Sequence, residues 1–551
     1  MSAAQRAAAT ARATGAPVFT RPLSESEVAG FHGGTGVLAG VPFVLKDNLD
    51  LVGIPTTGGC PALTKPATRS AGAVQRLLEA GAVPVGKTNL DQFATGLVGT
   101  RSPYGACTSV ASAEHISGGS SSGSAVAVAL GIVPLGLGTD TAGSGRVPAA
   151  FNGLVGVKPT KGLVSTAGLL PACRSLDCVT TLTRTVGQAR QAMAVLAAYD
   201  SEDPWSRPAP VTLPAGVARV AQVIGIPRGP LDLDPQHRQA WEAAVEHAHS
   251  VAAQLVEVDL EPFLAAARLL YEGPWLAERW AGFGHLLEPD GPHLDPVVRQ
   301  IILPGRELLA ADAFAGLDRL ATLRRASEGT WADLDALLLP VTPGHPTLAE
   351  VAADPIRANA RLGTYTNFVN LLDLCAVAVP AGQRADGLPF GVQLVAPAFA
   401  DGPLLELAAR WCGEAAEPAA IGAGRTLVAV VGAHLSGLPL NPQLVGLGGR
   451  LHTRTRTGGG YRLYALPGAG VPRPGLMRGD GPAGGIALEV WDLPHQGLGQ
   501  LADLIPSPLG LGTVQLADGT GVLGFLAEPA GLEGALDVSS DGGWRAHLAG
   551  R

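Results

Sequence analysis

"GGSSSGSAVAVALGIVPLGLGTDTAGSGRVPAAFNG", residues 118–153, holds two serine clusters set among small residues and separated by an apolar run. The pattern predicts a helix over 122–131, opened by Ser and Gly, and a buried strand over 133–140. A serine hydroxyl is a poor nucleophile until a base takes its proton. No histidine lies in this stretch, so a base for these serines has to come from elsewhere in the chain.

The flanking segments continue the alternation of strands and helices. The apolar residues at 40–47 and 82–88 predict buried strands, with an amphipathic helix at 71–81 between them. We therefore expect an α/β fold with a central mixed β-sheet flanked by helices. Helices dominate 236–335, and the later patterns are strands at 335–341 and 389–397 and a helix at 403–412.

The domain organisation is predicted from the length of the chain and from a change in its residue pattern. A chain of 551 residues suits two domains better than one. Residues 413–425 are small and polar and include proline, which is typical of a linker. Beyond them, short strand patterns bounded by turn residues predict a small β-rich α+β domain. We expect a first domain over 1–412, a linker over 413–425 and a second domain over 426–551.

Composition argues against several classes of protein. The net charge of −8 argues against a nucleic-acid binder, and the short cluster of Arg450, Arg454 and Arg456 is typical of a solvated turn. Six cysteines without a CxxC pair indicate reduced thiols in a cytoplasmic protein, not disulfides or a zinc site. The apolar run 124–138 is too short and too interrupted to span a membrane. The Ala- and Arg-rich residues 1–17 predict a frayed surface helix, with a transit peptide as the alternative.

Two motif matches fail on their context. Residues 81–88, "GAVPVGKT", satisfy the P-loop pattern, but the spacer predicts a strand and Pro84 has no N–H to offer a phosphate. Residues 119–123, "GSSSG", match a nucleophile elbow around Ser121, yet loop-like residues precede them where an elbow needs a strand. Neither nucleotide binding nor a Ser-His-Asp hydrolase is favoured.

Lys46 is the candidate base. It follows five core-type residues and is expected at a partly buried strand end. Desolvation favours the neutral amine and lowers the pKa of a lysine, and a neutral lysine is a general base near pH 7. The alternative is a lysine whose ammonium group reaches solvent. The pattern alone does not separate the two.

Ser144 lies in a turn of small residues after the strand at 133–140. Small residues let consecutive backbone N–H groups point one way and bind an anion, such as the oxyanion of a tetrahedral intermediate. The candidate donors for that oxyanion are the amides of Thr141, Ala142, Gly143 and Ser144. A glycine turn with an N-capping serine explains either serine cluster alone, but not both together with Lys46.

These residues carry a family resemblance. The motifs at 40–48, 118–131 and 138–160 resemble the amidase signature family, and the resemblance covers about residues 30–412. It implies a Ser-cisSer-Lys triad with Lys46 as base, Ser120 as bridging serine on a cis peptide after Gly119, and Ser144 as nucleophile. Such a relay needs no histidine, metal or cofactor. Where the family more often has glycine, this chain has the similarly small Ala142.

Within that family the chain resembles the allophanate hydrolases at 87–105, 171–180, 270–280 and 430–441. The resemblance implies hydrolysis of the terminal amide of allophanate to ammonia and N-carboxycarbamate. It assigns substrate binding to Arg279, which would hold the substrate carboxylate, and to its hydrogen-bonding neighbour Tyr271. A third expected contact is the backbone of the loop at Gly96–Gly99, with Gly96 as the candidate residue.

Three expectations about local structure go with this. Tyr271 and Arg279 are eight residues apart, about two helical turns, so both are expected on one helix face. Without the resemblance, Arg279 would be assigned to a surface ion pair with Glu278 or Glu272. Arg174 and Asp177 are expected to form a buried ion pair near the triad.

The resemblance also covers the second domain. It implies a γ-glutamyl cyclotransferase-like fold, associated with decarboxylation of N-carboxycarbamate. His434 stands in a glycine turn after a predicted strand and is the candidate acid/base there. His452, or a structural or dimer-forming role for the whole domain, is the alternative.

The expected partner is the small-molecule substrate, and a functional link to a separate biotin-dependent urea carboxylase is left open. The sequence shows no biotin-attachment motif and no credible ATP site, so this chain is expected to lack the carboxylase step. The resemblance suggests a homodimer, with no nucleic acid and no membrane. Two alternatives stay open: a biuret, aryl or aliphatic amidase with the same triad, and the A subunit of the tRNA-dependent amidotransferase. Urea assimilation and s-triazine breakdown are equally open as pathways.

Overall fold

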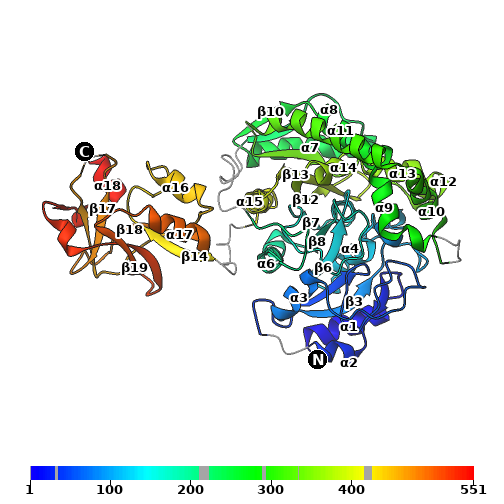
Figure 1. The fold of residues 1–551 in the computed structure, drawn as a ribbon, viewed down its shortest axis with the longest axis horizontal. Helices are drawn as coiled ribbons and strands as arrows, with labels where there is room; N and C mark the ends of the chain where they lie inside the picture. Colours follow the sequence, from blue (N-terminus) through cyan, green and yellow to red (C-terminus); the bar gives the residue numbers. More distant parts are fainter. Residues whose placement is uncertain are drawn as a thin grey trace. The chain divides into compact units, whose positions relative to one another are not determined.

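The computed structural model describes residues 2–31, 35–209, 223–287, 293–332, 334–414, 425–468 and 470–550. These fall into two compact units, within 2–414 and 425–550 (Figure 1). The predicted linker at 413–425 lies almost entirely outside the described residues, and its bounds stay a prediction. No helix in the described ranges combines the length and the apolarity needed to cross a membrane.

The first unit is built on a mixed sheet, as predicted. The described strands follow the order β1-β3-β2-β6-β8-β7-β12-β13-β11-β9-β10. Strands β3, β2 and β6 run parallel near one end and β11, β9 and β10 near the other, with antiparallel pairs between them. The strands are β1 (Phe19–Pro22), β2 (Pro42–Lys46), β3 (Val83–Thr88), β6 (Leu135–Asp140), β7 (Val155–Lys158), β8 (Cys178–Thr183), β9 (Val223–Pro227), β10 (Gln254–Val258), β11 (Ala336–Pro340), β12 (Leu374–Gln383) and β13 (Pro389–Pro397).

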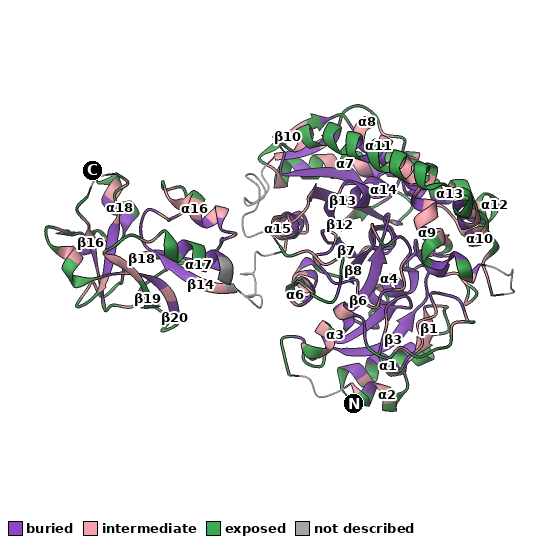
Figure 2. Cartoon of the chain, in the orientation of Figure 1, coloured by how far each residue is buried: buried purple, intermediate pink, exposed green. Residues whose placement is uncertain are grey.

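Most of the helices flank this sheet with their exposed residues on the outside (Figure 2). Helix α4 (Ser122–Ala129) is instead buried from Ser122 to Val128 and packs on β2 and β6, and the short helices at 146–151 and 367–371 are buried throughout as well. A helix that is apolar or small on every side can be buried in this way. The others are α1 (Ala3–Ala13), α2 (Glu25–Gly30), α3 (Gly72–Glu79), α5 (Arg146–Phe151), α6 (Val186–Leu196), α7 (Pro235–Val251), α8 (Glu261–Glu272), α9 (Trp275–Phe283), α10 (Pro296–Ile302), α11 (Ala310–Glu328), α12 (Leu348–Ala353), α13 (Pro355–Leu362), α14 (Asn367–Leu371) and α15 (Asp401–Trp411).

The N-terminal helix α1 differs from its prediction. Ser2 and Gln5 form a capping box at its start, and four of its alanines are buried. The helix packs against β3. The prediction of a frayed helix was wrong, because alanine side chains are small enough to let a helix lie close against its neighbour.

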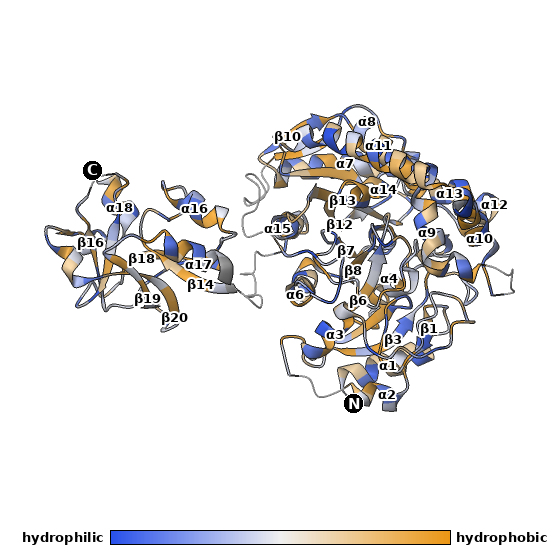
Figure 3. Cartoon of the chain, viewed as in Figure 1, coloured by the Kyte–Doolittle hydropathy of each residue, from blue (hydrophilic) through white to orange (hydrophobic). Residues whose placement is uncertain are grey.

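The second unit has its own hydrophobic core between a five-stranded sheet, ordered β15-β18-β14-β20-β19, and a three-stranded sheet, ordered β17-β16-β21. Its central strand β14 is mostly hydrophobic (Figure 3). The described elements are β14 (Arg425–Val430), α16 (Asn441–Gly446), β15 (Arg450–Arg456), β16 (Tyr461–Ala465), β17 (Pro474–Arg478), β18 (Ala487–Pro494), α17 (His495–Asp503), β19 (Leu509–Gln515), β20 (Gly521–Ala527), β21 (Leu536–Asp537) and α18 (Trp544–Ala549).

The basic cluster at 450–456 is not a turn. It forms the edge strand β15, in which Arg454 donates a 3.1 Å hydrogen bond to the buried carboxylate of Glu489. Threonines alternate with arginines here, and a β-branched residue at every second position favours a strand. Charged side chains also keep an exposed edge from pairing with another chain.

Candidate functional site

The first unit brings Lys46 and the two serine clusters together at one edge of the sheet. Strands β2 and β6 are parallel neighbours, with Leu45 opposite Leu137. Their carboxyl ends therefore meet, which puts Lys46, the last residue of β2, beside the turn that follows β6. Ser120 enters this site from the loop that precedes α4.

Lys46 is fully buried and contacts two hydroxyl groups. Its Nζ lies 2.7 Å from Ser120 Oγ and 2.8 Å from Thr139 Oγ1. The Gly119–Ser120 peptide bond is cis. Asn48 donates to the same Thr139 hydroxyl at 3.2 Å. The sequence did not single out Thr139, although it lies within the glycine-rich motif.

Burial lowers the pKa of Lys46 from its ordinary 10.5 to about 7. Desolvation of the ammonium group is the largest cause. The negative charges of Asp91, Asp177 and Asp140 oppose it and raise the pKa. A large fraction of Lys46 is therefore neutral near pH 7, as a general base requires.

Ser144 is 2% exposed, and its hydroxyl donates to the backbone oxygen of Gly96 at 3.4 Å. The two serine loops are joined through the backbone, since the Ser121 N–H donates to the Ser144 carbonyl at 3.1 Å. Within the described residues, no hydrogen bond links the side chains of Ser144 and Ser120. Lys46 and Ser120 are thus in hydrogen-bond contact, as the predicted relay requires. The Ser144 hydroxyl is hydrogen-bonded to the Gly96 carbonyl and not to Ser120.

The turn after β6 contains backbone N–H groups without a hydrogen-bond partner among the described residues. No described residue accepts a hydrogen bond from the N–H groups of Thr141, Ala142 or Ser144. Buried amides are normally paired, so three unpaired ones in one turn are suited to an anion. The N–H of Gly143, the fourth candidate donor, instead donates to the Asp140 carboxylate at 2.8 Å.

A buried ion pair shapes this turn. Asp140 and Arg146 are fully buried, and Arg146 Nη2 lies 3.0 Å from Asp140 Oδ1. The Asp140 carboxylate also accepts a hydrogen bond from the Gly145 N–H at 3.1 Å. Arg146 reaches on to Gln393 and Asn370, which lie more than 200 residues away in sequence. Sequence reasoning did not identify this pair.

Asp177 supports the same turn from the other side. Its buried carboxylate accepts a 2.5 Å hydrogen bond from the Thr141 hydroxyl and further bonds from the N–H groups of Ala172 and Cys173. Desolvation raises the pKa of Asp177 to about 6. The predicted ion pair with Arg174 is not formed, because Arg174 is exposed.

Arg279 is 1% exposed, and its guanidinium carbon lies 5.9 Å from the centre of the Tyr271 ring. The prediction that both residues share one helix was wrong. A helix ends at Glu272, and Gly273 and Pro274 intervene before the next begins at Trp275. The two residues nevertheless meet across the break.

Few polar partners surround the Arg279 guanidinium. It donates to Thr95 Oγ1 at 3.4 Å, and its buried Nε finds no acceptor in the described part of the chain. The alternative of a surface ion pair with Glu278 is excluded, because that carboxylate accepts from Ser175 at 2.6–2.7 Å and Arg279 is not at the surface. An underpaired buried cation suits an anionic ligand.

Asp91 organises the loop that carries Gly96. Its buried carboxylate accepts hydrogen bonds from the N–H groups of Gly99 and Arg101, both at 3.0 Å. A Cβ atom at Gly96 or Gly119 would come within 2.6 Å and 2.2 Å of Asp91 Oδ2, so the close approach requires glycine at both positions. Sequence reasoning missed Asp91 because a lone aspartate in a loop gives neither a periodic signal nor a motif.

The two discounted motifs have structural roles. Lys87, the lysine of the P-loop match, lies in strand β3 and forms a buried ion pair with Asp47 at 3.2 Å. The Ser121 hydroxyl bonds to the backbone of Thr139, at 3.1 and 3.2 Å. Across the described residues, no group of three or more His, Cys, Asp or Glu side chains is placed to hold a metal ion.

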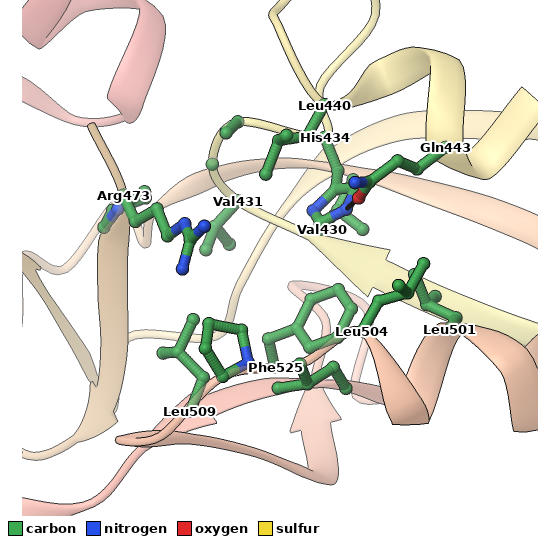
Figure 4. Close-up of a pocket in the computed structure, with 15 residues that line it drawn as sticks. Val430, Val431, His434, Leu440, Gln443, Arg473, Leu501, Leu504, Leu509 and Phe525 are labelled. Carbon is green, nitrogen blue, oxygen red and sulfur yellow. Dashed lines mark hydrogen bonds between the residues drawn. The ribbon is translucent and has the colours of Figure 1, made fainter. Parts of the chain in front are cut away.

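In the second unit, His434 lines a pocket after strand β14 (Figure 4). Its Nε2 donates to Gln443 Oε1 at 3.0 Å, and its ring stacks on Phe525 with centres 5.6 Å apart. Burial lowers the pKa of His434. His452, the alternative candidate, lies on the edge strand β15 and is absent from the pocket lining.

Comparisons with known proteins agree with this architecture. The amidase family model matches residues 17–405, and the model described as the allophanate hydrolase C-terminal domain matches residues 426–549. The structure of Kluyveromyces lactis allophanate hydrolase superposes with a TM-score of 0.79 at 39% identity, covering 97% of this chain and 94% of that one.

Curated relatives give the same grouping. Urea amidolyase of Lachancea kluyveri is 43% identical over 542 residues, covering 93% of this chain but 30% of that protein, so this chain spans less than a third of it. The A subunit of glutamyl-tRNA(Gln) amidotransferase from Natronomonas pharaonis is 35% identical over 415 residues, covering 67% of this chain and 94% of that protein. The chain therefore belongs to the amidase family, in the group whose members carry an allophanate hydrolase C-terminal domain.

Proposed function

We propose that the first unit hydrolyses the terminal amide of allophanate to ammonia and N-carboxycarbamate. The observation that carries this proposal is the buried Lys46 amine, 2.7 Å from the Ser120 hydroxyl and beside a turn with three unpaired amides. The amine supplies a base, and the amides supply donors for an oxyanion.

The reaction begins when the Ser144 hydroxyl turns from the Gly96 carbonyl toward Ser120. Ser120 then passes its own proton to neutral Lys46 and takes the proton of Ser144. The Ser144 oxygen attacks the amide carbon, and the carbonyl oxygen becomes an oxyanion facing the amides of Thr141, Ala142 and Ser144. The proton returns through the same relay to the leaving nitrogen, ammonia departs, and an acyl-enzyme ester remains.

Water completes the cycle. The neutral amine of Lys46, again through Ser120, takes a proton from the water that attacks the ester carbon. The ester bond breaks, the proton returns to Ser144, and N-carboxycarbamate is released. Every proton taken up is returned, so the enzyme ends the cycle as it began.

Arg279 gives the site its preference for a substrate with a carboxylate. A guanidinium group binds a carboxylate through two parallel hydrogen bonds, which orients the substrate as well as holding it. Tyr271 packs beside that guanidinium, and we propose that its hydroxyl donates to the same part of the substrate. The backbone of Gly96, already in contact with Ser144, is the third proposed substrate contact.

For the second unit we propose decarboxylation of N-carboxycarbamate with His434 as the acid. Loss of carbon dioxide from a carbamate leaves its electron pair on nitrogen, which must then gain a proton. The protonated form of His434 supplies this proton and then regains one from water. The apolar surroundings of the pocket favour loss of the charged carboxylate. His452 is not among the residues that line this pocket, which supports His434 over it.

The test is ammonia release from allophanate compared with biuret, malonamide and glutamine, by wild type and by Arg279→Met. We expect allophanate to be preferred and Arg279→Met to lose about 100-fold or more in kcat/KM for allophanate but not for biuret or malonamide, which have no carboxylate for a charge-assisted contact. The matched control is Arg174→Met, which removes an exposed arginine. Equal losses on the uncharged amides would show that Arg279 does not read a carboxylate.

The similarity to the A subunit of the amidotransferase covers 67% of this chain, whereas the allophanate hydrolase C-terminal domain model matches residues 426–549 of the second unit. This favours allophanate over an aminoacyl-tRNA substrate. Where allophanate comes from carboxylation of urea, the proposed partner activity is a biotin-dependent urea carboxylase. The homodimer and the cytoplasmic location stay predictions.

A further inference from the structure

The pocket of the second unit combines an apolar wall with a small group of polar side chains. It encloses about 590 Å³ of open space, including its open mouth. Leu501, Leu504, Leu509 and Phe525 line one side (Figure 4). None of the residues that line it is an aspartate or a glutamate.

Arg473 brings the only full positive charge among those lining residues. Its guanidinium group points into the open space (Figure 4), and no described residue accepts a hydrogen bond from it or forms an ion pair with it. Its Nε atom is buried without a partner. Its backbone, in contrast, is held in place, since the Arg473 carbonyl accepts from Leu466 N–H at 3.1 Å immediately before strand β17.

His434 and Gln443 complete the polar part of the pocket. Because Gln443 Oε1 can only accept, the 3.0 Å contact makes His434 Nε2 the donor and leaves Nδ1 as the free nitrogen of the neutral ring. Neither side chain offers a negative charge to Arg473. A cation that has lost part of its water beside an apolar wall is costly unless an anion accompanies it.

We propose that this pocket binds a small carboxylate, paired with Arg473, whose remaining atoms lie against Leu504 and Phe525. One planar guanidinium with two N–H groups on an edge matches a carboxylate. A phosphate would call for more donors than this single arginine and a neutral imidazole provide.

Two sources of carboxylate fit this chemistry. One is the dicarboxylate product of the first unit, in which case the inference rests on the proposed function. The other is an unrelated carboxylate with an apolar tail, for which the leucines and Phe525 provide a wall. Malonate, a stable analogue of the product in which CH2 replaces NH, and butyrate distinguish the two.

The experiment uses the full chain with Arg279→Met as background, so that carboxylate binding in the first unit is removed. Titration calorimetry measures malonate and butyrate binding to this background, to Arg279→Met with Arg473→Met, and to Arg279→Met with Arg478→Met. Arg478 is the matched control, because it lies on strand β17 and is exposed. Circular dichroism checks that each variant is folded.

We expect one of the two ligands to bind at one site per chain, about tenfold or more weaker after Arg473→Met and unchanged after Arg478→Met. Tighter binding of malonate identifies the product as the ligand, and tighter binding of butyrate identifies an apolar carboxylate. Absence of binding by both, or equal binding with and without Arg473, overturns the proposal. Ammonia release from allophanate by wild type tests the proposed function separately, so the two can fail independently.

Discussion

Thr141 and Asp177 are joined by a 2.5 Å hydrogen bond across 36 residues of sequence, from the Thr141 hydroxyl to a buried carboxylate. Thr141 contributes one of the three unpaired amides of the turn after β6, and the charge of Asp177 raises the pKa of Lys46. One carboxylate thus positions the candidate oxyanion turn and tunes the candidate base.

Removing that carboxylate separates the two effects. In Asp177→Asn the negative charge that favours the ammonium form of Lys46 is gone, so the pKa of Lys46 falls further. The acidic limb of the pH profile of kcat/KM should move to lower pH. Thr141→Val removes the hydrogen bond but keeps the charge, and should lower kcat without moving that limb. An unshifted limb in both variants would mean that Asp177 acts only as a structural support.

Lys46 sets the pH dependence of wild type. Its pKa of about 7 means that the neutral base accumulates as pH rises through that value, so kcat/KM should rise with pH up to about 8. Lys46→Met and Lys46→Arg should each lose about 100-fold or more, since arginine is not deprotonated in proteins. Steady-state kinetics from pH 5.5 to 9 measure both. Activity of Lys46→Arg near that of wild type would exclude a neutral lysine as base.

Lys46 should also lower the stability of the fold near neutral pH. Its pKa is about 7 when folded and near 10.5 when unfolded, so the unfolded chain binds more protons between these values. Stability therefore rises with pH across that window, and the deficit is fully present below pH 7. Lys46→Met should unfold at a higher temperature than wild type at pH 6, and the difference should shrink toward pH 10. Calorimetric Tm values at both pH values measure this.

Ser144 and Ser121 are distinguished by covalent labelling. A sulfonyl fluoride reacts with a serine that has a base and an oxyanion site. Ser144→Ala should abolish labelling. Ser121→Ala, whose hydroxyl bonds to the backbone of Thr139, should keep it. Intact-protein mass spectrometry counts the label, and the reverse pattern would restore the nucleophile-elbow interpretation.

Tyr271 has a ring and a hydroxyl that can be removed separately. Tyr271→Phe keeps the ring beside Arg279 and should cost about tenfold or less in kcat/KM for allophanate, the size of one hydrogen bond. Tyr271→Leu also removes the cation–π contact at 5.9 Å and should raise KM about a further three- to tenfold. Equal effects of the two changes would assign the whole contribution to the hydroxyl.

Some of these features follow from the sequence alone. An apolar strand that ends in lysine, and two loops of serine and glycine around an apolar run, are local patterns, and local patterns set helices, strands and turns. They predicted the mixed α/β fold, the position of Lys46 at a strand end and the change to short strand patterns after the segment that begins at residue 413. The comparisons confirm the amidase fold and the C-terminal domain.

The tertiary structure decided which distant groups meet. Asp177, Asp91 and Thr139 reach Lys46 and the serine loops only through the sheet and its loops, so no spacing in the chain reveals them. Tyr271 and Arg279 lie on two separate helices where one was expected, and Arg174 is exposed to solvent. Hydrophobic periodicity reports whether a residue faces a core, but the partner of a buried charge is chosen by packing between segments far apart in sequence, which the pattern of neighbours does not record.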